Sequence, residues 1–248
     1  MHRVQVLVAS LAFSIGATAV PALADPSAQE ILAKVAKKQY LAKTSGLKSI
    51  SFDIDSPMFA MMGGEMGVHY VWKAPDKEKC TMTGADNPMI PKAMMEKQMG
   101  RLGRLCVGQS FAEEYDGFEM TAEKDGDLFK VSGTSTDETK DAKAFVLWVN
   151  SDYIPVKQET TARKAQMGQP PTQTMEYKTA ATEDGKYYLA EFTQPGGMGG
   201  GAKLNWEKVN GILILTSMAM NSPMGEMKMS FINMKVNEPI DDSVFAVQ

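Results

Sequence analysis

The sequence is poor in the residues that enzymes and metal centres use most often. Histidine occurs only at His2 and His69, and cysteine only at Cys80 and Cys106. Neither a G-x-S-x-G nor an H-E-x-x-H motif occurs, so the chain offers no nucleophile–base pair of the hydrolase kind and no zinc-protease site. We therefore predict a protein that is not an enzyme, with no catalytic residues, no cofactor and no resident metal.

An excess of positive charge is also missing. The chain has 26 Lys and Arg residues against 30 Asp and Glu residues, which gives a formal net charge of −4. Proteins that bind nucleic acid present strongly basic faces, so nucleic acid is excluded as a partner. The adjacent acidic pairs Glu113–Glu114 and Asp241–Asp242 are typical of solvated strand ends and turns, where the two side chains diverge.

Long hydrophobic runs are absent after the N-terminus. Residues 4–20 are mainly apolar, follow His2 and Arg3, and lead to Ala22-Leu23-Ala24, a small-x-small cleavage pattern. We interpret residues 1–24 as a signal peptide cleaved before Asp25, which predicts a periplasmic protein. Residues 25–248 are expected to form a single domain and to be monomeric.

The two cysteines form a disulfide candidate. Cys80 and Cys106 enclose a loop that an oxidising compartment would allow to close, and such a bridge contributes on the order of 3–4 kcal/mol. The sequence does not give the geometry, so the bridged and the free states both remain open.

Methionine, in contrast, is abundant, with 20 residues. Many of these gather in three segments: Met58, Met61, Met62 and Met66; Met89, Met94, Met95 and Met99; and Met218, Met220, Met224, Met227 and Met229. Methionine is unbranched and polarizable, so a wall made of it can repack around partners of different shape. The enrichment indicates an interior that accommodates variable apolar ligands, and a core that merely uses methionine as filler is the alternative.

The hydrophobic periodicity predicts an α+β protein. An apolar stripe predicts a helix over 26–44, and a second stripe through Met94, Met95, Met99, Leu102 and Leu105 predicts a helix over 91–105. Elsewhere the period is two, and four Asx-Gly pairs supply the positive φ angles of tight hairpins. A long antiparallel meander must curl, so we expect an incomplete β-barrel covered by the N-terminal helix and by a short inserted lid helix.

Several short motifs resemble the LolA family of periplasmic lipoprotein carriers and the related outer-membrane lipoprotein-sorting proteins. They are the strand over 66–73 with its Trp72-Lys73-Ala74-Pro75 end, the hairpin over 147–157, and the closing stretch over 237–245. The resemblance implies an incomplete barrel that holds acyl chains, and also inner-membrane donor and outer-membrane acceptor proteins as partners. Ala74 stands where the carriers proper have an arginine that couples lid closure to lipoprotein loading.

We therefore predict a carrier that binds the acyl chains of lipoproteins or other lipids. The expected ligand-binding residues are Phe52, Ile54, Met66, Tyr70 and Trp72 in the wall and Met94, Met95, Met99 and Leu102 in the lid. Two alternatives remain open. One is a Cu(I)-binding protein that uses Met218, Met220, Met227 and Met229, because thioethers are soft ligands. The other is a regulatory or lipid-sensing interaction protein of the envelope.

Overall fold

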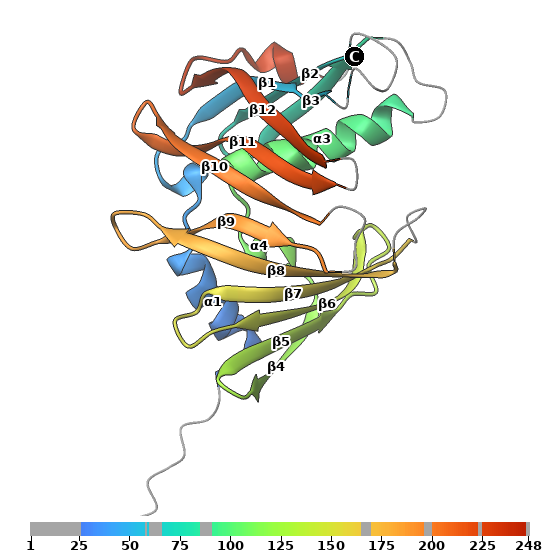
Figure 1. The fold of residues 1–248 in the computed structure, drawn as a ribbon, viewed down its shortest axis with the longest axis vertical. Helices are drawn as coiled ribbons and strands as arrows, with labels where there is room; N and C mark the ends of the chain where they lie inside the picture. Colours follow the sequence, from blue (N-terminus) through green and yellow to red (C-terminus); the bar gives the residue numbers. More distant parts are fainter. Residues whose placement is uncertain are drawn as a thin grey trace, which may run out of the picture.

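The fold is one open antiparallel sheet with helices on one face. The computed structural model describes residues 26–57, 59, 66–84, 91–164, 170–195, 200–222 and 225–246. Within them, twelve strands form a sheet in the order β3-β2-β1-β12-β11-β10-β9-β8-β7-β6-β5-β4. The end strands β3 and β4 do not pair with each other, so the sheet is not closed into a barrel (Figure 1). This confirms the predicted fold class, and the signal-peptide prediction over 1–24 lies outside the described residues.

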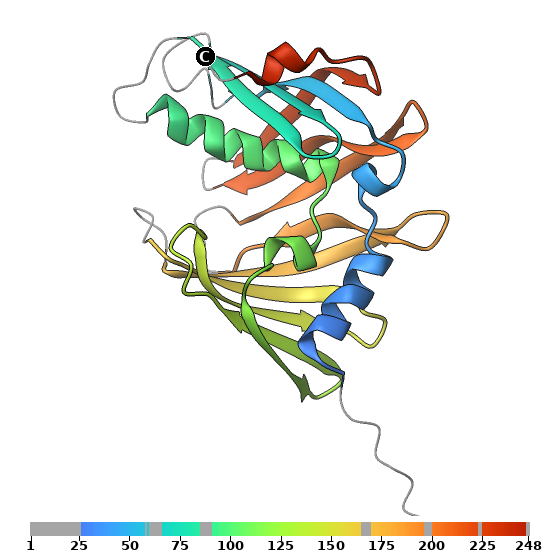
Figure 2. The same ribbon diagram turned by 180° about the vertical axis from the view of Figure 1, so that it is seen from behind.

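The strands are β1 (Ser49–Asp55), β2 (Gly67–Lys73), β3 (Lys77–Thr83), β4 (Glu119–Asp125), β5 (Leu128–Thr134), β6 (Ala142–Val149), β7 (Pro155–Ala162), β8 (Thr172–Ala181), β9 (Tyr187–Thr193), β10 (Gly201–Val209), β11 (Ile212–Ser222) and β12 (Gly225–Val236). The helices are α1 (Ala28–Lys38), α3 (Lys92–Val107) and α4 (Phe111–Glu114), and the 3₁₀ turns are η1 (Ala42–Thr44) and η2 (Asp242–Phe245). Seen from behind, α1, α3 and α4 all lie across the same face of the sheet (Figure 2).

The sheet has a narrow neck between β9 and β10. These strands pair only through Gly201, Ala202 and Lys203, whereas most neighbouring strands pair along more of their length. The buried apolar side chains separate into two clusters, one on each side of this neck. We call β1–β3, β10–β12, α3 and η1 the methionine lobe, and β4–β9, α1 and α4 the tyrosine lobe.

The N-terminal helix is shorter than its sequence pattern predicts. A capping box between Ser27 and Glu30 starts α1, but the helix ends at Lys38 instead of continuing to 44. Gln39 is extended, and the Tyr40 amide donates a hydrogen bond to the Tyr187 carbonyl at 2.7 Å. The chain crosses here from the tyrosine lobe to the methionine lobe, so the tertiary contact replaces the last helical turns. The apolar stripe is therefore divided between two cores.

Two further elements differ from the sequence prediction. Strand β3 was not predicted, because its alternating Lys and Glu residues hide the apolar period; charged residues are common on edge strands, where they discourage pairing with other chains. The pair Asp116–Gly117 joins α4 to β4 and is not a hairpin turn. By comparison, Asn210–Gly211 forms the expected tight turn between β10 and β11, with φ values of 49° and 81°.

Candidate functional site

The predicted wall residues lie together beneath α3. The buried cluster of the methionine lobe contains Phe52, Ile54, Tyr70, Trp72, Met95 and Met99, with Met66 and Leu102 packed against its edge. Strand alternation places Tyr70 and Trp72 on the helix-covered face of β2, because β2 is antiparallel to β1 with Phe52 opposite Tyr70. Phe52 also stacks on Tyr70, with ring centroids 5.1 Å apart. The structure therefore brings the wall and much of the lid into one apolar layer.

Helix α3 approaches the sheet closely because one of its glycines lies over an aromatic ring. A Cβ atom at Gly103 would lie 2.3–2.6 Å from ring atoms of Tyr70. Gly100 has room, since a Cβ there would be 3.6 Å from the Cys80 Cβ atom. The two glycines, which weaken the helix as a local structure, thus include one that the tertiary contact requires.

The lid helix does not bury its whole apolar stripe. Met95 is 5% exposed and Met99 4% exposed, but Met94 is 52% exposed and Leu105 37% exposed. Met94 belongs to the first turn of α3 and faces solvent, so the inward face is narrower than the sequence indicated. The lid residues in contact with the methionine core are Met95, Met99 and Leu102.

Polar contacts hold α3 at its rim. Arg104 donates from Nε to the Glu78 carboxylate at 2.9 Å, and the Met82 amide donates to Glu96 Oε1 at 3.0 Å. Lys97 and Arg101 both pair with Asp141, which lies directly before β6 of the tyrosine lobe. The charged face of α3 therefore bridges the two lobes. The sequence signal for this bridge is the i, i+4 spacing of Lys97 and Arg101 on the helix.

The two cysteines are free thiols, so of the two states that the sequence left open the structure has the unbridged one. Cys80 lies on edge strand β3 next to Gly100, whereas the Cys106 thiol donates to the Leu215 carbonyl of β11 at 3.5 Å. Three strands separate β3 from β11 in the sheet, and α3 spans them. Burial raises the pKa of Cys80 to about 12 and also raises the pKa of Cys106, which keeps both thiols protonated at neutral pH.

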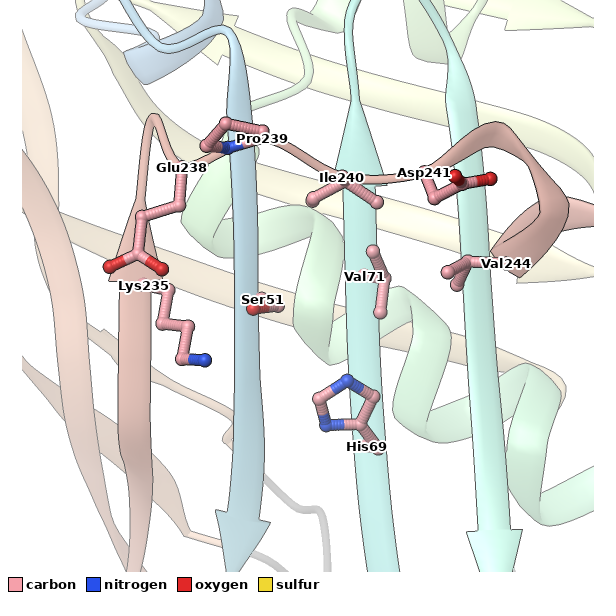
Figure 3. Close-up of a pocket in the computed structure, with 9 residues that line it drawn as sticks. All are labelled: Ser51, His69, Val71, Lys235, Glu238, Pro239, Ile240, Asp241 and Val244. Atoms are coloured by element: carbon pink, nitrogen blue, oxygen red, sulfur yellow. The ribbon is translucent and has the colours of Figure 1, made fainter.

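A pocket lies on the opposite face of the same strands (Figure 3). It is lined by Ser51, His69, Val71, Lys235, Glu238, Pro239, Ile240, Asp241 and Val244. His69 Nδ1 is 2.6 Å from Asp53 Oδ1, and Asn233 donates to Asp53 Oδ2 at 2.8 Å. Although partial burial acts in the other direction, the hydrogen bonds from Asn233 and His69 lower the pKa of Asp53. These contacts tie β1, β2 and β12 together on the solvent side.

The C-terminal segment closes this pocket and is held by lysines of β2 and β3. Lys73 and Lys77 donate to the two oxygens of Asp242 at 2.7 and 2.9 Å, and Lys79 donates to the Val244 carbonyl at 2.9 Å. The hydrogen bonds from Lys73 and Lys77 lower the pKa of Asp242 to about 2. Asp241 caps η2 by accepting from the Ser243 amide.

Of the other acidic pair, Glu113 forms a capping box with Ser110 and pairs with Lys43 at 2.7 Å. Asp241, Asp242 and Glu113 therefore have structural partners.

The tyrosine lobe has a polar centre that the sequence did not indicate. Gln158 is 3% exposed; its amide nitrogen donates to the Tyr115 hydroxyl and to Thr160 Oγ1, and its carbonyl accepts from the Tyr177 hydroxyl. Tyr115 in turn stacks on Phe145. Burial raises the pKa of both tyrosines. This network fixes the positions of several side chains at once, which distinguishes it from the interior of the methionine lobe.

In the part of the chain that the structure describes, no three His, Cys, Asp or Glu side chains gather as a metal-binding group. The helices among those residues include none with the length and hydropathy needed to cross a bilayer.

Comparison with known proteins gives matches only among solved structures. No family model matches the sequence, and no curated protein does. A LolA superfamily protein from Nitrosomonas europaea is 12% identical, with 90% of this chain and 98% of that chain covered and a TM-score of 0.35.

Two further structures are similar over a comparable share. An outer membrane lipoprotein-sorting protein domain from Vibrio parahaemolyticus is 11% identical, with 88% and 95% covered and a TM-score of 0.37. A DUF1329 family protein from Desulfovibrio piger is 8% identical, with the same coverage and a TM-score of 0.36. All three structures match this chain over most of its length at 8–12% sequence identity.

Proposed function

We propose that this protein is a carrier that binds acyl chains between helix α3 and the methionine lobe of the sheet. The observation that carries the proposal is the layer beneath α3, where Met95 and Met99 lie on an apolar face built from Phe52, Ile54, Tyr70 and Trp72. Methionine side chains have three rotatable bonds and rearrange at low cost, so this layer suits ligands of variable length.

The way α3 is held supports a lid that opens. Its contacts to Glu78 and Asp141 are ion pairs at the rim, with carboxylates that are partly or largely exposed. Exposed ion pairs contribute about 0–1 kcal/mol each. The apolar layer therefore provides most of the closure, and an acyl chain that replaces those contacts removes the main reason for the lid to stay shut.

Burial of a hydrocarbon chain is large enough to drive this exchange. Each methylene that leaves water contributes about 0.8 kcal/mol, so a chain of about sixteen carbons could gain on the order of 12 kcal/mol. Part of that gain offsets the displaced lid contacts, which moderates the affinity and allows release. We infer a periplasmic location from the predicted signal peptide, and a donor and an acceptor in the two membranes from the sequence resemblance.

The test is direct binding of a fluorescent fatty acid, combined with mass spectrometry of organic extracts of the protein purified from its own periplasm. Met99→Gln places an amide in the apolar layer and is expected to weaken binding about tenfold, which corresponds to about 1.4 kcal/mol. Met94→Gln is the matched control on the same helix, because Met94 is 52% exposed, and it should bind like the wild type.

Lid opening can be followed at the buried thiol beneath α3. The thiol of Cys106 is 0% exposed in the structure. In a Cys80→Ser variant, where Cys106 is the remaining thiol, it should react slowly with iodoacetamide. Asp141→Asn removes the partner of Lys97 and Arg101 and should accelerate that reaction, as should the fatty acid. The proposal fails if no acyl chain binds, or if Met99→Gln and Met94→Gln change the affinity equally.

A further inference from the structure

The β11–β12 hairpin aligns four methionines in two successive cross-strand pairs. Met218 is opposite Met229 and Met220 is opposite Met227, with no register shift between the pairs. Residues two apart on a strand share a face, so all four side chains lie on the same side of the hairpin. Met218 and Met229 are each 1% exposed, whereas Met220 and Met227 are half-buried nearer the turn. Figure 1 shows β11 and β12 side by side in the methionine lobe.

The spacing of the two pairs allows the sulfur atoms to converge. Residues directly opposite in an antiparallel pair have Cβ atoms about 5 Å apart, and successive residues on one face are about 7 Å apart along the strand. A methionine side chain spans these distances and adjusts through three torsions. By these general spacings the four Cβ atoms mark the corners of a small rectangle, whose centre is within reach of a thioether from each corner.

The chemistry of this group selects a soft cation. Thioether sulfur is a neutral, soft ligand that suits Cu(I), whereas Zn²⁺, Ca²⁺ and Mg²⁺ prefer thiolate, imidazole or oxygen ligands. Ala219 and Lys228, between the two pairs, lie on the other face of the hairpin by strand alternation. A singly charged ion is also the least costly to place among apolar side chains.

We propose that Met218, Met220, Met227 and Met229 form a binding site for Cu(I), coordinated by three or four thioether sulfurs. The half-buried pair, Met220 and Met227, receives the ion at the turn end of the hairpin, and the buried pair completes the coordination. None of the methionines of α3 is a ligand, but Met218 and Met229 belong to the same buried cluster as Met95 and Met99, so a bound ion and an acyl chain would occupy one apolar interior.

The experiment uses the full-length mature protein in a Cys80→Ser/Cys106→Ser background, because free thiols would otherwise bind Cu(I) themselves. The probes are Cu(I) kept reduced with ascorbate and, separately, Ag(I), which has no accessible redox change. Equilibrium competition with a chromophoric Cu(I) chelator gives affinity and stoichiometry, and X-ray absorption identifies the ligand atoms. We expect one metal ion to bind to each protein molecule, with only sulfur atoms coordinated to the metal.

The variant Met220→Leu/Met227→Leu should lose affinity for Cu(I) by more than about 100-fold. Changing the groups that orient a metal's ligands usually costs about 10–100-fold, and this variant removes two ligands outright. The control variant is Met94→Leu/Met120→Leu, which removes one exposed methionine of α3 and one partly buried methionine of β4 in the tyrosine lobe, and it should bind normally. Leucine conserves volume, and circular dichroism verifies folding.

The site is rejected if the Cys80→Ser/Cys106→Ser parent does not retain equimolar metal, if its X-ray absorption spectrum shows nitrogen or oxygen ligands, or if both methionine variants lose binding equally. The spectrum of this parent protein decides the question even if the hairpin variant misfolds.

Discussion

The two lobes of the sheet solve the same packing problem with different chemistry. The core of the methionine lobe includes five buried methionines: Met82, Met95, Met99, Met218 and Met229. The described core of the tyrosine lobe contains no buried methionine and is centred on Gln158 and its bonds to Tyr115 and Tyr177. Hydrogen bonds fix one arrangement of side chains, whereas methionine contacts tolerate many.

This difference suggests a division of roles along one continuous sheet. The tyrosine lobe carries α1 and also Asp141, which pairs with Lys97 of α3. We propose that it is the more rigid of the two lobes and that the interior beneath α3 is the more adaptable one. Substitutions that test rigidity should therefore be costly in one lobe and mild in the other.

The largest effect is expected at Gln158. Gln158→Leu removes the amide that bonds the buried hydroxyl groups of Tyr115 and Tyr177, and a buried polar group that loses its partner costs about 1–3 kcal/mol. We expect the free energy of unfolding, measured in urea, to fall by about 3 kcal/mol. Adding Tyr115→Phe and Tyr177→Phe removes the unsatisfied hydroxyls and should recover much of the loss. A stable single variant would show that the network does not hold the lobe.

The next effect tests the closeness of α3 to the sheet. Gly103→Ala introduces a methyl group against the Tyr70 ring and should destabilise the protein by about 1–3 kcal/mol through overpacking. Gly100→Ala is the control, because its methyl group has room and alanine favours the helix by up to about 1 kcal/mol. The midpoint temperatures of thermal unfolding of the two variants measure the difference between them. Equal effects would mean that α3 does not lie against Tyr70.

A smaller effect is expected within the methionine core. Met218→Leu and Met229→Leu conserve volume in an adaptable layer, so each should lower the free energy of unfolding by less than about 1.5 kcal/mol. Urea titration of the single and double variants measures this. A loss as large as that of Gln158→Leu would remove the proposed contrast between the lobes.

The smallest effect concerns the C-terminal segment on the outer face of the methionine lobe. Hydrogen bonds from Lys73 and Lys77 lower the pKa of Asp242 to about 2, below its unfolded value of about 3.9. The contribution of this carboxylate is therefore complete above pH about 4 and is lost as the pH falls through about 2.

Hydrogen exchange of residues 240–246, corrected for the intrinsic rate, should rise over that range of pH. In Asp242→Asn, exchange should be fast already at neutral pH, while exchange in β1 stays unchanged as the internal control. Equal exchange in wild type and variant would show that the lysines do not hold the segment.

The sequence predicted the local elements well, because each depends on a pattern carried by consecutive residues. Alternation predicted most of the strands, and Asn210–Gly211 predicted a tight turn. The stripe through Met94, Met95, Met99, Leu102 and Leu105 predicted α3, although Met94 and Leu105 are exposed. It also predicted that Phe52, Tyr70 and Trp72 face the same side as the lid. The prediction failed where two distant segments determine the outcome, as at Gln39, where pairing with Tyr187 ends a helix that the stripe would continue.

The sequence by itself determined the strand periodicity, the lid helix, the abundance of methionine and the scarcity of catalytic residue types. Only the tertiary structure decided that the core divides at the β9–β10 neck, that Cys80 and Cys106 stay apart, and that Met218 and Met220 meet Met229 and Met227. The reason is physical: periodicity is a property of neighbours along the chain, whereas register and lobe boundaries depend on which distant side chains pack together.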